Sequence, residues 1–154
     1  MIHGFVLALH IVGIVVWLGG LFFVTFIAAP SVGRLDAAAA RAFWRHLLSR
    51  FLVFGGASLV LVIATGVAMV FLVFGGYAHI PGLHRVNMMI GIPAIALFGY
   101  VAVVPWRRLR RACDAGDEVS ADRSIRLARA LVAAALMLGL TAAATSALAR
   151  YYAF

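Results

Sequence analysis

The sequence predicts an all-α fold, an integral membrane four-helix bundle that forms a single transmembrane domain over residues 1–154. Two observations lead to this prediction. Hydrophobic residues make up 66% of the chain and charged residues only 12%, a balance that soluble domains of this length do not reach. Four segments are also apolar over the length of about 20 residues that a bilayer requires. These predicted spans cover residues 5–29, 51–74, 84–106 and 128–149, and the short connections between them favour one bundle.

The first span, residues 5–29, contains no charged residue. It is too long for the apolar region of a secretory signal, and no basic residue precedes it, so we expect a retained helix. His10, Gly13, Trp17 and Gly20 follow one another at spacings of three and four. They therefore share one face of this helix.

The three later spans are bounded by basic or histidine residues. The second follows Arg50, the third runs from His84 to just before Arg107, and the fourth ends before Arg150. No acidic residue lies in any of the four spans. This excludes carboxylate proton relays and the usual di-iron or hydrolytic sites, so any activity requires a bound cofactor.

The basic residues orient the bundle in the membrane. All 13 are arginines, and most lie in and beside the two connections that follow the first and third spans: Arg34, Arg41, Arg45, Arg50, Arg107, Arg108, Arg110, Arg111, Arg123, Arg126 and Arg129. Loops rich in arginine stay on the cytoplasmic side, so we expect both termini on the outer side of the cell's inner (plasma) membrane. The formal charge of +8 then reflects topology and contact with anionic headgroups, and no nucleic acid is expected as a partner.

The histidines gather at the opposite end. His10 lies inside the first span, where an ionisable side chain is costly unless it is used, and is therefore a candidate functional residue. His84 opens the third span, and we expect it at a similar depth. Two histidines on different helices can hold a haem iron from both sides or bind a copper ion. His79 is the alternate ligand if His84 points away.

Haem is favoured by the arginines at this end. A buried haem carries two propionates that need cations, and Arg85 and Arg150 are the basic residues available. Their other role would be to mark helix ends. Gly13 could admit a flat macrocycle or a neighbouring helix, and Trp17 could stack on the ring or fill the bundle.

Copper is the alternative cofactor. Met88 follows His84 by four residues and could face the same pocket. A soft thioether together with His10 and His84 suits reduced copper. Apolar packing is the other role of this methionine.

The first span also carries a resemblance to known families. Residues 9–23, from Leu9 to the Trp17-Leu18-Gly19-Gly20 pattern and beyond, with Pro30 after them, resemble the first helix of the CopD-like (copper resistance D) membrane proteins. The same region is similar to the HemJ-type protoporphyrinogen oxidases. Three further segments match these families in position. Residues 43–48 fall where the families begin helix two, and residues 83–89 fall where they begin helix three. The Thr65-Gly66 pair falls where they carry a threonine-glycine pair. The resemblance implies a haem b or metal site that involves His10.

Two departures limit what this resemblance implies. HemJ-type proteins carry a lysine at the start of helix three, where this chain has Asn87, and a proline-arginine-leucine-phenylalanine stretch where it has residues 24–30. If the lysine serves the porphyrinogen chemistry, this chain binds haem without oxidising protoporphyrinogen. The favoured hypothesis is a haem b redox protein that transfers electrons between a membrane quinol or porphyrinogen and an acceptor. The alternatives are a copper-binding or copper-transport protein of CopD type, and an accessory subunit without a cofactor. Under each of these hypotheses the bundle could pair with itself or join a larger membrane complex.

Overall fold

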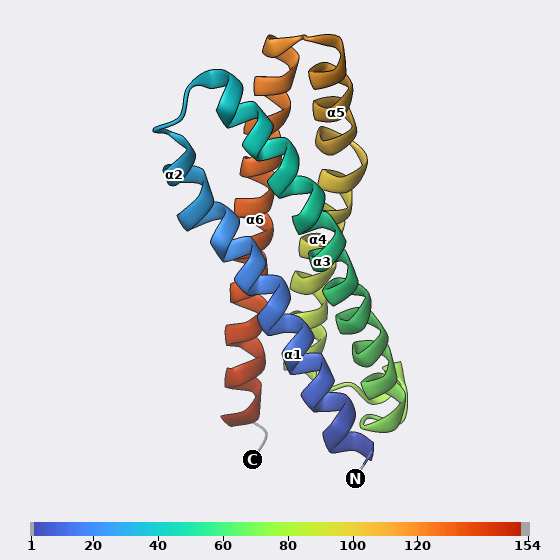
Figure 1. Ribbon diagram of the computed structural model, residues 1–154. Coiled ribbons are helices and arrows are strands. Elements are labelled where there is room, and N and C mark those ends of the chain that lie inside the picture. Colours follow the sequence, from blue (N-terminus) through green and yellow to red (C-terminus); the bar gives the residue numbers. More distant parts are fainter. Residues whose placement is uncertain (1, 152–154) are drawn as a thin grey trace.

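The computed structural model describes residues 2–151, with side chains up to Leu148. It is built from long helices that run side by side (Figure 1). The elements are α1 (Ile2–Phe22), the π-helical turn η1 (Phe23–Ala28), α2 (Ala29–Val32), α3 (Ala37–Leu72), the 3₁₀ turn η2 (Tyr77–His79), α4 (Gly82–Val103), α5 (Pro105–Ala115) and α6 (Glu118–Tyr151).

These elements form four rods that are long and apolar enough to cross a membrane: Ile2–Val32, Ala37–Leu72, Gly82–Ala115 and Glu118–Leu148. The predicted all-α four-helix bundle is confirmed, and the four candidate spans support a multi-pass membrane protein. The helices are longer than the predicted spans. The spans follow runs of apolar residues, which cover only the part of each helix that lipid would surround. α3 begins well before residue 51 and α6 well before residue 128. The third predicted span crosses a break at Val104, where Pro105 starts α5.

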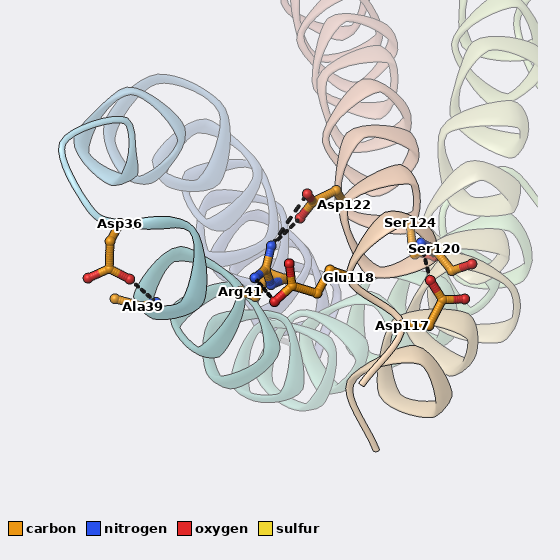
Figure 2. A network of polar contacts seen from close by, with 8 residues as sticks. All are labelled: Asp36, Ala39, Arg41, Asp117, Glu118, Ser120, Asp122 and Ser124. Atoms are coloured by element: carbon orange, nitrogen blue, oxygen red, sulfur yellow. Dashed lines mark hydrogen bonds and ion pairs between the residues drawn. The ribbon is translucent and has the colours of Figure 1, made fainter. Parts of the chain in front are cut away.

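The two ends of the bundle differ in composition. The α2–α3 and α5–α6 connections lie at one end, while α1 begins and α6 finishes at the other (Figure 1). We call the first the arginine-rich end and the second the terminal end. Side-chain caps start the two helices that leave the arginine-rich end: the Ala39 N–H donates to Asp36 Oδ1 (2.8 Å), and the Ser120 N–H donates to Asp117 Oδ1 (3.0 Å; Figure 2).

The core fills the bundle unevenly. α1 packs mainly on α3, and α4 mainly on α6, with Leu21 and Leu136 fully buried between them. Among the described side chains, α1 has no buried residue before Gly13, α4 has none before Ala94, and α6 has none after Gly139. In the terminal half of the bundle, which holds His10, the buried side chains therefore come mainly from α3 and the α3–α4 connection, with Thr65, Val70 and Ile80.

A π-helical turn, η1, interrupts the first rod before α2. Pro30 has no backbone N–H, and its ring clashes with the carbonyl four residues earlier in a regular α-helix. The wider turn of η1, directly before this proline, relieves that conflict. The Thr25 hydroxyl donates to the Leu21 carbonyl across the start of this turn (2.8 Å).

The cap of α6 predicts a pH-dependent stability. Hydrogen bonds from the side chain and backbone of Ser120 hold the pKa of the exposed Asp117 carboxyl below its ordinary value. A lowered pKa stabilises the folded state above the pKa of the unfolded chain, about 3.9, and this contribution is lost as the pH falls through the folded value. We therefore expect Asp117→Ala to lower the midpoint of thermal unfolding in detergent at neutral pH, and the difference from the parent protein to shrink on acidification. A difference that stays constant with pH would contradict this.

Candidate functional site

The side chain of His10 lies between α1 and α3. Its Nδ1 is 2.8 Å from the hydroxyl oxygen of Thr65, which is itself buried. The neighbouring Gly66 leaves space for the ring, since a Cβ on this residue would lie 3.3 Å from His10 Cε1. Thr65 thus contacts one nitrogen of the imidazole, and Gly66 allows the ring to lie close to the α3 backbone.

The hydrogen bonds of Thr65 favour one tautomer of His10. The hydroxyl carries one proton, and its oxygen lies 2.6 Å from the Leu61 carbonyl and 3.2 Å from that of Val62. If the shorter of these contacts takes the proton, the oxygen accepts its remaining bond from the Nδ1–H of His10. Nε2 then keeps its lone pair, which is the form of imidazole that binds a metal.

Gly13 and Trp17, one and two turns further along α1, serve helix packing. A Cβ on Gly13 would lie 2.8 Å from Val62 Cγ2 and 3.4 Å from the Ser58 carbonyl, so α3 already occupies the space that the glycine opens. The Trp17 ring meets Phe98 edge to face, with 6.2 Å between centroids. Its Nε1 is buried and has no hydrogen-bond partner among the described residues.

The second predicted ligand, His84, lies at the start of α4. Its ring packs edge to face on Phe74 (5.2 Å between centroids), just beyond the end of α3. Its Nδ1, like Oδ1 of Asn87 one turn later, is buried and lacks a hydrogen-bond partner in the part of the chain that the structure describes. A buried polar atom without a partner is costly. Oδ1 of Asn87 could accept a hydrogen bond from a bound group, and Nδ1 of His84 could accept or donate one.

The other predicted site residues surround this start of α4. The exposed Arg85 donates from Nη2 to the Ala78 carbonyl (2.9 Å) and so ties down the α3–α4 connection. His79 and Met88 are exposed. The side chain of Arg150 lies outside the described residues.

His10 and His84 contact different levels of the bundle. His10 contacts α3 at Thr65, whereas His84 contacts Phe74, past the end of α3 at Leu72. Seven residues of helix already separate these levels by about 10 Å. Two nitrogens on opposite sides of one iron lie only about 4 Å apart, given metal–nitrogen bonds of about 2 Å. Within the described residues, no group of three or more His, Cys, Asp or Glu side chains could hold a metal either.

Comparison with protein-family models, curated proteins and solved structures gives no match. The resemblance to CopD-like and HemJ-type proteins therefore remains a prediction from the quoted residues. Any function assigned to this chain depends on the geometry around His10.

Sequence reasoning did not anticipate the role of Thr65. The Thr65-Gly66 pair stood out only as a point of resemblance, because its contact with His10 depends on how α1 and α3 are rotated about their axes. A signal was present: a threonine and a glycine interrupt an apolar run on the helix that directly follows the one carrying His10. Small and polar residues at such a position are typical of a close, hydrogen-bonded helix contact.

Proposed function

We propose that this chain is a haem b-binding redox protein of the inner (plasma) membrane, in which His10 is an axial ligand of the haem iron through Nε2. One observation carries the proposal: Nδ1 of a histidine inside a candidate span lies 2.8 Å from the hydroxyl oxygen of Thr65. If Nδ1 donates this hydrogen bond, Nε2 has its lone pair available for the iron. The burial pattern of the terminal half is compatible with it, because the side chains of α1, α4 and α6 there are not buried by the protein and could contact a flat macrocycle.

The residues present fit haem with one protein ligand better than with two. His10 would hold the haem iron, as a single histidine does in globins and peroxidases. His84 contacts Phe74, beyond the end of α3, which suits contact with the polar edge of a haem rather than its iron. Arg85 stands beside it and uses one of its five N–H donors on Ala78, so donors remain for a propionate.

When bound, haem would supply one-electron oxidation and reduction. The chain's own residues then have separate tasks. His10 binds, Thr65 orients the imidazole, and Gly13 keeps α1 close to α3 so that this hydrogen bond can form. The resemblance suggests a membrane quinol or a porphyrinogen as electron donor, and Asn87 at the expected lysine position favours the quinol.

The cofactor content of the purified protein tests this proposal. We expect protein extracted in mild detergent to carry stoichiometric haem b and no stoichiometric copper. His46→Ala is a matched control, because this exposed histidine lies on α3 near the arginine-rich end and should leave the haem content unchanged. Stoichiometric copper that is lost in Met88→Leu would instead favour the CopD-type copper site, and a protein with neither cofactor would favour the accessory subunit.

The proposed orientation predicts which residues a membrane-impermeant maleimide can reach. Cys113 is the one cysteine of the chain, so Cys113→Ser gives a clean background. Two cysteines are then introduced separately into the Cys113→Ser protein, both at exposed positions. His79→Cys tests the terminal end, and Ala115→Cys tests the arginine-rich end. We expect reagent added to intact cells to label only the first, and reagent added to inside-out vesicles to label only the second. The reverse pattern would overturn the orientation.

A further inference from the structure

A cleft opens at the arginine-rich end, between the last turns of the first rod and α6. It consists of two adjoining cavities of about 310 and 290 Å³, which share Ala29, Arg126 and Arg129 in their walls. We call the two together the arginine cleft. It lies at the other end of the bundle from His10, so a ligand bound in this cleft is independent of the haem assignment.

The charges around the cleft do not balance. Three arginines, Arg41, Arg126 and Arg129, line it together with one acid, Asp122. That acid is already paired: Arg41, with a side chain only 13% exposed, lies 3.5 Å from Asp122 and 2.6 Å from Glu118 (Figure 2). Neither Arg126 nor Arg129 is within ion-pair distance of a carboxylate in the part of the chain that the structure describes.

Arg129 is held in place without losing its hydrogen-bonding capacity. Its guanidinium carbon lies over the ring of the buried Trp44, 5.6 Å from the centroid. Stacking of this kind fixes the plane of the guanidinium and leaves N–H donors at its edge. Arg126 lies three residues earlier on the same helix, so the two side chains leave α6 about one turn apart. Together they can present a fork of donors to one anion.

The rest of the first cavity is apolar. Val24, Ala130 and Ala133 line it, and the hydroxyl proton of Thr25 is already donated to the Leu21 carbonyl. The cavity thus has the N–H donors of arginine at one end and small apolar side chains along the rest of its lining. This combination matches a molecule with an anionic head and a hydrocarbon tail. The position fits as well, because residues 128–149 form the predicted fourth span and Arg129 stands at its boundary, where headgroups meet acyl chains.

We propose that the arginine cleft is a binding site for the phosphate group of a membrane phospholipid. Arg126 and Arg129 hold the phosphate, and an acyl chain lies along Val24, Ala130 and Ala133. Arg41 keeps Asp122 neutralised, so that this carboxylate does not repel the phosphate. The lipid comes from the leaflet at the arginine-rich end.

Phosphatidylglycerol titrated into the delipidated full-length protein in neutral detergent tests this site. We expect it to raise the thermal unfolding midpoint and to remain bound in native mass spectrometry. The double variant Arg126→Gln/Arg129→Gln should bind at least about tenfold more weakly, because each lost hydrogen bond involves two charged groups. Arg126→Gln alone should show part of this loss while sparing the stack of Arg129 on Trp44.

The control removes the same charge elsewhere. Arg107→Gln/Arg108→Gln lies on the exposed face of α5, outside both cavities, and should bind the lipid like the parent protein. Equal weakening in this control would overturn the proposal in favour of unspecific charge attraction. Inorganic phosphate that stabilises the protein as well as the lipid does would overturn the lipid as the source of the phosphate. A double variant that binds phosphatidylglycerol like the parent protein would overturn the site itself.

Discussion

Gly13→Leu is expected to force α1 away from α3 and to destabilise the bundle by about 1–3 kcal/mol or more, the cost of overpacking a tight contact. Even a single Cβ at this position would lie 2.8 Å from Val62 Cγ2 and 3.4 Å from the Ser58 carbonyl. The side chain of valine can shift slightly, but a backbone carbonyl cannot, and leucine adds three more carbons. Thermal unfolding followed by circular dichroism in detergent should show a clearly lower midpoint, and gel filtration a less uniform protein.

Gly19→Leu is the matched control for this prediction. It lies on the same helix, six residues further on, and a Cβ there would meet nothing within 4 Å. We expect a change within about 0.5 kcal/mol, as for most surface substitutions. If both leucine variants were equally stable, the close α1–α3 contact would be wrong, and with it the position of His10 against Thr65.

Thr65→Val is expected to weaken haem binding by about 10- to 100-fold, the usual effect of removing the group that orients a metal-binding histidine. Valine has nearly the shape of threonine, so the α1–α3 contact should survive. The Nδ1–H of His10 would lose its acceptor, and nothing would hold the ring or its tautomer. Haem titration into the apoprotein measures the affinity, and the midpoint potential of the bound haem gives a second readout that a loss of packing alone would not change.

Thr65→Ser separates orientation from packing. Serine keeps the hydroxyl 2.8 Å from His10 Nδ1 and loses only a methyl group. We expect near-parental haem affinity and potential in this variant. Loss of affinity in Thr65→Ser but not in Thr65→Val would show that the residue acts by packing, which would contradict the role assigned to its hydroxyl.

Apolar patterning predicts the number of candidate membrane spans in this chain but not where the helices begin and end. A run of about 20 apolar residues is a physical requirement of the bilayer, so the spans can be counted in the sequence. Where α3 and α6 begin depends on single caps, Asp36 and Asp117, outside the apolar runs. The break before Pro105 and the π-helical turn before Pro30 follow from the missing N–H of proline, and neither is visible in hydropathy.

The site was predicted in part for a related reason. His10 stands out in the sequence because an ionisable residue inside a span is costly. Its partner depends on the register of two antiparallel helices, which the α2–α3 connection and the glycine contact at Gly13 determine together. The apolar run that His84 opens predicts a depth similar to that of His10. The structure adds that its ring contacts Phe74, beyond the end of α3, a contact that depends on the α3–α4 connection and that hydropathy does not reveal.

The central claim of the haem proposal is that His10 binds the iron and that His84 does not. The reduced-minus-oxidised absorption spectrum of detergent-purified protein tests this most directly, with His10→Ala and His84→Ala compared at equal protein concentration. We predict b-type bands in the parent protein and in His84→Ala, and none in His10→Ala. Bands of parental intensity in His10→Ala would contradict the proposal, and loss of the bands in both variants would show that the two histidines approach one iron in a way this structure does not have.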